Sequence, residues 1–206
     1  MSAGGLDFRQ AASADAGTIA AIVAEVADGL VDELLGGLVP ALGASDLLAL
    51  AFGQGEGVYH PENVVLAEDD NETRGLLFAY PSARQSLPDL ARHYLPPARL
   101  SRFEDLLTAS VPETLWINTL WVAADSRNLG LGGCLLELAE SWAERQALRG
   151  LALFAWAAAR PALAFYERAG FSVVRPLPAA DPPVQGLGGP HSRGGFVLAR
   201  FRNGSR

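Results

Sequence analysis

Residues 127–132 read Arg-Asn-Leu-Gly-Leu-Gly and lie between an apolar run, 115–122, and an amphipathic pattern that starts near Gly130. This order predicts a turn that leaves a strand and opens a helix. Glycine at positions 130 and 132 keeps side chains away from the main-chain N–H groups. The start of a helix attracts anions, because its N–H groups point outward and the helix dipole is positive there. The turn therefore predicts an anion site, for instance for a pyrophosphate.

Two common phosphate-binding motifs are excluded. A dinucleotide-binding turn needs Gly-x-Gly-x-x-Gly, whereas the run that starts at Gly130 ends in Leu135. A phosphate loop of the nucleotide triphosphatases needs a lysine, and all 16 Lys and Arg residues of the chain are arginine. A plain glycine-rich connection between a strand and a helix stays open as the structural alternative.

A second block, Ala162-x-x-x-Tyr166-x-x-x-Gly170-Phe171, follows further along the chain. Together with the strand and the Arg127-x-x-Gly130-x-Gly132 turn, it resembles the GNAT acetyltransferase superfamily, whose acyl-CoA signature is Arg/Gln-x-x-Gly-x-Gly/Ala. The resemblance is strongest over residues 115–174, and the elements before it fit the order of the same fold. It implies that the chain uses acetyl-CoA as co-substrate and acetylates an amine.

The resemblance also assigns roles to residues around the turn. In the family, the strand before the turn separates from its parallel neighbour, and the pantetheine arm pairs with its main chain, here at Leu120 and Val122. Unpaired amides at this point would also hold the oxyanion of the reaction. The side chains of both residues are equally expected to pack in the core. The residues expected to bind the pyrophosphate of coenzyme A are Arg127, Asn128, Leu129, Gly130, Leu131 and Gly132.

Tyr166 matches the family's tyrosine, which is thought to protonate the departing CoA thiolate. A phenol with a pKa of about 10 donates to a thiolate of about 8.5 only if the transfer is coupled to bond breaking or helped by the local field. The alternative is a packing tyrosine on an amphipathic helix, with its hydroxyl at the rim.

The sequence departs from the family at two positions. Many members carry a glutamate general base where this chain has Asn118; an amide cannot accept a proton, but it can orient a water or an amine. A polar residue in an apolar strand needs partners, so Asn118 either faces the site or bonds to a neighbouring loop. Ala159 replaces an asparagine that contacts the pantetheine arm in many relatives. Other candidates for a base are bulk water and Glu33, Glu68, Glu104, Asp105, Glu113 and His93.

The composition restricts the remaining classes of protein. The chain has 206 residues, of which 50% are hydrophobic and 19% charged, which is typical of a globular protein. Its formal net charge of −7 disfavours nucleic-acid binding. Cys134 is the only cysteine and the histidines lack ligand spacing, so we expect no disulfide and no metal site. No apolar run reaches membrane length and no signal pattern is present, so we expect a cytoplasmic protein without a membrane partner. A homodimer is compatible with the sequence.

The pattern before the turn predicts five elements. They are a strand at 6–10, a helix capped by Asp15 that extends through Leu30, a helix capped by Ser45, and a hairpin of strands 63–68 and 74–80.

The rest of the chain predicts a helical excursion at about 81–113, then a buried strand and the helix of about 130–149, stopped by Gly150. Strand 151–156 would pair in parallel with strand 115–122. A helix from Pro161 to Gly170 follows. The chain ends with strands 171–174 and 195–201 around an irregular Pro/Gly loop at about 176–195.

These elements predict a single domain over residues 1–206 of the α/β class (α+β, mixed sheet). We expect the GNAT acyl-CoA N-acyltransferase fold, with a central twisted mixed sheet and helices on both faces. The expected function is acetyl transfer from acetyl-CoA to an amine of a small molecule or a peptide by direct attack, with Asn118 and Tyr166 as the catalytic residues. The alternative is a non-catalytic acyl-CoA-binding or regulatory module of the same fold.

Overall fold

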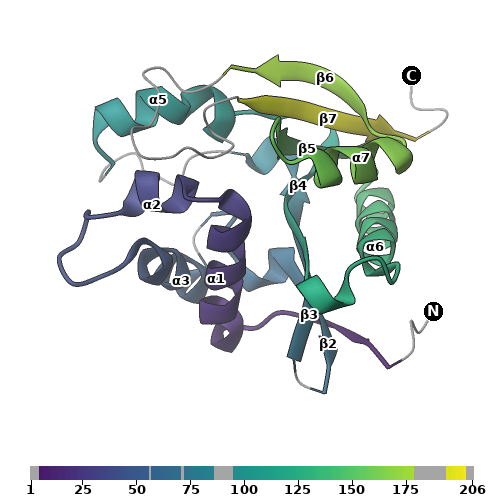
Figure 1. Ribbon diagram of the computed structural model, residues 1–206, viewed down its shortest axis with the longest axis horizontal. Helices are drawn as coiled ribbons and strands as arrows, with labels where there is room; N and C mark the ends of the chain where they lie inside the picture. The colour runs from purple at the N-terminus through teal and green to yellow at the C-terminus, as the bar shows by residue number, and fades with distance from the viewer. Residues whose placement is uncertain (1–4, 56, 71, 86–94, 179–193, 203–206) are drawn as a thin grey trace.

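The structure, a computed structural model, describes residues 5–55, 57–70, 72–85, 95–178 and 194–202. A seven-stranded sheet forms its centre and carries helices on both faces (Figure 1). The strands are β1 (Asp7–Gln10), β2 (Val64–Asp69), β3 (Glu72–Pro81), β4 (Thr114–Val122), β5 (Gly150–Trp156), β6 (Ser172–Leu177) and β7 (Gly195–Phe201). The helices are α1 (Ala16–Ala27), α2 (Leu30–Leu35), α3 (Ala44–Gln54), α5 (Pro97–Leu107), α6 (Leu131–Arg145) and α7 (Arg160–Arg168).

The sheet has the strand order β1-β2-β3-β4-β5-β7-β6. The β4–β5 pair is parallel and the other neighbouring pairs are antiparallel. The predicted α/β class, mixed sheet and parallel pairing of the two buried strands are therefore confirmed. The sequence did not predict that β7, the last strand, lies between β5 and β6.

Two hydrophobic cores hold the layers together, one on each face of the sheet. On one face α1 and α3 pack against the sheet through residues such as Ile19, Phe52 and Phe78. On the other face α6 and α7 pack through residues such as Leu135 and Tyr166. No described helix has an apolar stretch long enough to cross a membrane.

The predicted end of the first helix and the predicted cap of the second helix were wrong. The chain turns into the left-handed region at Asp28 (φ 51°) and Gly29 (φ 93°), so Leu30 opens α2 instead of continuing α1. The cap of α3 is Gly43, whose N–H donates to Asp46 Oδ2 at 2.8 Å, and Ser45 lies inside the first turn.

The C-terminal half corrects a further expectation, that Gly150 stops the helix after the turn. Helix α6 ends at Arg145, and Gly150 is a buried residue of β5, where a Cβ would collide with the main chain of Arg200. The interior-facing row of α6 is Leu131, Leu135, Ala139 and Ala143, so Cys134 is only half-buried. Outside the described residues lie Asn71 of the hairpin turn, 86–94 of the excursion with His93, and 179–193 of the Pro/Gly loop.

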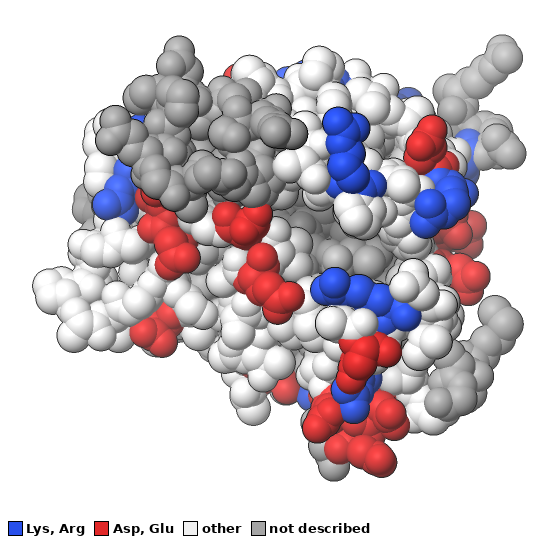
Figure 2. Space-filling view, in the orientation of Figure 1, with Lys and Arg blue, Asp and Glu red and all other residues white. Residues whose placement is uncertain are grey.

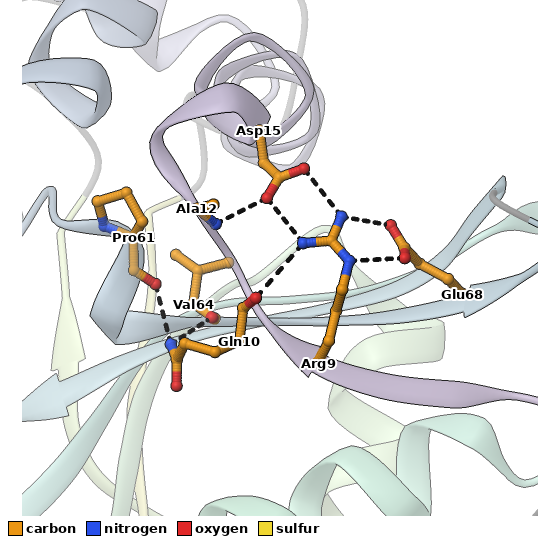
Figure 3. A network of polar contacts seen from close by, with 7 residues as sticks. All are labelled: Arg9, Gln10, Ala12, Asp15, Pro61, Val64 and Glu68. Atoms are coloured by element: carbon orange, nitrogen blue, oxygen red, sulfur yellow. Dashed lines mark hydrogen bonds and ion pairs between the residues drawn. The ribbon is translucent and has the colours of Figure 1, made fainter.

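A polar network ties β1 to β2 and to the start of α1 (Figure 3). The Arg9 guanidinium donates to Glu68 from Nε at 2.7 Å and to Asp15 from Nη1 at 2.8 Å. Asp15 also accepts from the Ala12 N–H at 2.7 Å. Gln10 Nε2 donates to the main-chain carbonyls of Pro61 and Val64. The network fixes the edge strand and sets the direction in which α1 leaves it.

We expect Arg9→Met to lower the free energy of unfolding at about pH 7 by about 1–2 kcal/mol, because two carboxylates lose their cation. The hydrogen bond from Arg9 holds the pKa of Asp15 below its usual 3.8. The contribution of Asp15 to the free energy of unfolding is therefore complete above pH 3.8, and it is lost as the pH falls through the lowered pKa. Urea unfolding at about pH 7 and about pH 3 measures it, with the exposed Arg175→Met as control. A loss that is equal at both pH values would contradict this account.

Candidate functional site

The sheet opens between β4 and β5. Their parallel register runs from Thr114–Gly150 to Ile117–Leu153, although β4 continues to Val122 and β5 to Trp156. On the other side of β4, Phe78 pairs with Thr119 and Ala79 with Ile117, so Asn118 is an extra residue opposite β3. Such a β-bulge bends its strand and ends regular pairing. The far half of β4 thus separates from β5.

The main chain of Leu120 and Val122 faces this opening. The Ala123 N–H donates to the Arg74 carbonyl of β3 at 2.9 Å. Main-chain groups alternate in direction along a strand, so those of Leu120 and Val122 point away from β3. Their side chains pack against the core under α6 and α7. In the described part of the chain, no strand pairs with this stretch of β4 on the side of the opening.

The turn after β4 leads into α6 with its N–H groups uncovered. Asn128 (φ 63°) and Gly130 (φ 90°) both adopt the left-handed conformation, and the Leu129 side chain between them is 76% exposed. Gly130 is the N-cap of α6; no side chain caps the helix and its first turn holds no acidic residue. Arg127 folds back, and its Nε donates to the Val122 carbonyl at 3.0 Å. The arrangement favours an anion at the start of α6.

The glycines of the turn differ in what they do. A Cβ on Gly130 or Gly133 would meet nothing within 4 Å, so these two positions leave the turn open. A Cβ on Gly132 would lie 3.2 Å from Phe165 Cζ of α7. A Cβ at Gly132 would thus crowd Phe165, so this glycine has a packing role between α6 and α7 in addition to the role expected at the turn. Leu131 is buried beneath Gly75 and contributes only its main chain to the turn.

Tyr166 lies next to this contact on α7. Its side chain is buried, and its ring packs against Phe165 and Phe171 with centroid distances of 5.2 and 5.5 Å. Among the described residues its hydroxyl has no hydrogen-bond partner. Burial raises the pKa of Tyr166 above its usual value of 10.0, so the phenol keeps its proton at neutral pH.

Asn118 both faces solvent and is bonded to its neighbours. Its Nδ2 donates to Tyr80 Oη at 3.3 Å, and its Oδ1 accepts from Thr119 Oγ1 at 3.1 Å. Tyr80 Oη in turn donates to Gln85 Oε1 at 2.5 Å. Sequence reasoning missed Tyr80 and Gln85, because no spacing relates them to Asn118 and only the sheet brings them together.

Three of the side chains considered as alternative bases form ion pairs. Glu33 pairs with Arg102 on α5, Glu68 with Arg9, and Glu113 with Arg149. Glu104 and Asp105 are exposed on α5. Within the described ranges, no three His, Cys, Asp or Glu side chains are grouped so that they could hold a metal ion.

The second departure from the family pattern, Ala159, is the N-cap residue of α7. Its N–H donates to the Trp156 carbonyl and its carbonyl accepts from the Leu163 N–H, each at 3.0 Å. Its methyl group offers neither a cap to the helix nor a polar contact to a ligand.

The surface over these elements is hollowed. Figure 2 shows the hollow between α7 and the start of α6, with arginine side chains above and below it and acidic side chains on its α1 side. Arg127 of the turn and Arg160, the first residue of α7, are both exposed.

Comparisons with known proteins agree with the fold. The model of the acetyltransferase (GNAT) family matches residues 56–171. The crystal structure of an acetyltransferase has a TM-score of 0.66 at 19% identity, covering 95% of this chain and 98% of that chain. An N-acetyltransferase from Staphylococcus aureus Mu50 has a TM-score of 0.66 at 18% identity, covering 94% and 100%. A GNAT-family acetyltransferase from Streptococcus pneumoniae has a TM-score of 0.53 at 16% identity, covering 95% and 98%. No curated protein matches the chain.

The contrast between two glycines gives a test of the α6–α7 contact. Replacing Gly133 by alanine adds helix propensity in open space, and we expect the free energy of unfolding to rise by up to about 1 kcal/mol. Gly132→Ala crowds Phe165, so its free energy of unfolding should be about 1 kcal/mol below that of Gly133→Ala. Urea unfolding of both variants measures the difference. Equal stability of the two would show that Gly132 is not needed for packing.

Proposed function

The chain belongs to the GNAT acetyltransferase family, and on that premise we propose that it transfers the acetyl group of acetyl-CoA to an amine of a small molecule or a peptide. The family uses acetyl-CoA as its acyl donor. The observation that carries the proposal for this chain is the open edge of β4 directly beside the uncapped start of α6.

The residues of the turn suit the pyrophosphate of coenzyme A. The N–H groups from Asn128 to Gly132 surround a helix start that carries no competing acid. Gly130 and Gly133 leave room for close approach to the main chain. The guanidinium of Arg127 is exposed beside them and adds positive charge. These features support binding of the diphosphate part of the donor.

The edge of β4 suits the pantetheine arm. Its amide groups would pair with the main chain of Leu120 and with the N–H of Val122, as a further strand pairs with an exposed sheet edge. The Val122 carbonyl already accepts from Arg127, so it is the least available of these groups. An N–H of β4 near the bulge would polarise the thioester carbonyl and hold the oxyanion.

The chemical step follows from the remaining residues. The amine nitrogen, oriented by Asn118, forms a bond to the acetyl carbon, and the C–S bond to coenzyme A breaks. Tyr166 donates its proton to the leaving thiolate and regains one from solvent. The amine releases its proton to water, because Asn118 cannot accept it. Burial keeps Tyr166 protonated throughout the neutral range, and because a raised pKa also makes the phenol a weaker acid, its proton transfer must be coupled to breaking of the C–S bond.

A second function, a non-catalytic acyl-CoA-binding or regulatory module, is favoured by two observations. Asn118 stands where relatives carry a base, and Ala159 offers no side-chain contact to the pantetheine arm. Both departures concern turnover and affinity, and neither removes the turn or the open strand edge.

A thiol-release screen with acetyl-CoA across amines, amino acids and peptides tests the proposal. We expect at least one amine to release free CoA. Tyr166→Phe should then lower kcat by about 10²-fold, which is typical for loss of a general acid. Tyr59→Phe, the same change in a half-buried tyrosine that packs against Phe52 and Phe78, serves as control.

Equal rates for the wild type and Tyr166→Phe would show that Tyr166 is not the general acid. Binding of acetyl-CoA in calorimetry without CoA release for any amine would favour the regulatory module. Absence of both binding and turnover would overturn the proposed function.

A further inference from the structure

We propose that Tyr80 and Gln85 are positioning residues that hold the Asn118 amide in one orientation, through a chain of hydrogen bonds whose direction is set at the end of α5. The role of Asn118 toward an acceptor amine rests on the proposed function. The orientation itself follows from the contacts.

The series of hydrogen bonds begins at the main-chain carbonyl of Leu107, the last residue of α5. The last carbonyls of a helix have no partner within the helix. Gln85 Nε2 donates to this one at 3.0 Å. Because a carbonyl can only accept, the nitrogen of the Gln85 amide must face α5 and its oxygen must face Tyr80.

The orientation of the Gln85 amide determines which hydrogen bonds Tyr80 can make. A phenol has one proton, and Tyr80 donates it to Gln85 Oε1. The Tyr80 oxygen can then only accept from Asn118, so the Asn118 amide must turn its Nδ2 toward Tyr80, at 3.3 Å. Asn118 Oδ1 consequently faces Thr119, whose hydroxyl donates to it at 3.1 Å. Every link has a single consistent direction from α5 to β4.

Burial makes the loss of any hydrogen bond in this series costly. Tyr80 is 1% exposed and Thr119 is 2% exposed, and buried polar groups that lose a partner are costly. Burial also raises the pKa of Tyr80, so it stays a neutral phenol and does not serve as the base. Asn118, at the other end, is exposed. A buried and fully paired set of groups thus ends in an amide at the opening of the sheet.

The orientation leaves Asn118 with defined free valences. One N–H of Nδ2 and one lone pair of Oδ1 remain for a ligand. The lone pair of Asn118 Oδ1 would accept a hydrogen bond from an N–H of the acceptor amine. The lone pair of the amine nitrogen would then point away from Asn118. Because the first hydrogen bond of this series is made to α5, that helix supports the orientation of Asn118 through Gln85 and Tyr80.

Side-chain amide NMR tests the orientation without any turnover. In Tyr80→Phe, the Nδ2 proton signals of Asn118 should shift, and their exchange with water should rise about tenfold as one hydrogen bond is lost. Tyr59→Phe removes the same atom from a nearby half-buried ring, which packs against Phe78, and should leave these signals unchanged. Gln85→Met is a second variant, at a half-buried position, and should produce the Tyr80→Phe signature. Asn118 signals that are alike in all three variants and the wild type would overturn the proposal.

Kinetics tests the consequence for the acceptor. With an amine that the wild type acetylates, Tyr80→Phe should lower kcat/KM for the amine about tenfold while KM for acetyl-CoA stays within about twofold. Tyr59→Phe should change neither. An equal loss toward both substrates would indicate a general structural role and overturn the positioning of the acceptor. If the wild type acetylates no amine, the proposed function fails, and the NMR result alone decides whether Tyr80 and Gln85 orient Asn118.

Discussion

The separation of β4 from β5 is the constraint on which the rest of the site depends. It follows from one extra residue, Asn118, which shifts the alternation of side chains along β4. Before the bulge, Trp116 packs on the α1 face and Ile117 on the α6 face; after it, Trp121 packs on the α1 face and Leu120 on the α6 face. The bulge thus keeps apolar residues in both cores while the strand leaves its neighbour. The cost is a stretch of main chain without a partner strand, which a ligand can pair with.

Packing keeps the parts of the site in fixed positions relative to each other. Gly132 and Phe165 hold α7 against the first turn of α6. Arg200 of β7 pairs with Glu140 of α6, donates to the Ala169 carbonyl at 2.7 Å and lies 5.1 Å from the centre of the Phe171 ring. The uncapped helix start and Tyr166 therefore belong to one packed unit. On the α1 face, Asn118 is held in position by a series of hydrogen bonds through Tyr80 and Gln85 to the Leu107 carbonyl.

The sequence predicted the strands and the turn because their signals are local. The apolar run 115–122, the turn at Gly130 and the strand 195–201 each follow from composition and spacing, and the structure has them within a residue or two. The bulge at Asn118 could not be predicted, since a shift of register leaves no mark in a run that is apolar on both faces. The packing role of Gly132 and the contact of Tyr80 with Gln85 depend on elements that meet only in the fold.

The central claim is that acetyl-CoA lies along the open edge of β4 with its pyrophosphate at the start of α6. Backbone amide NMR during a titration with acetyl-CoA tests it most directly. The account predicts saturable shifts that are largest at the amides of Leu120, Val122 and residues 128–133. Shifts confined to other elements, or none at saturating acetyl-CoA, would contradict it.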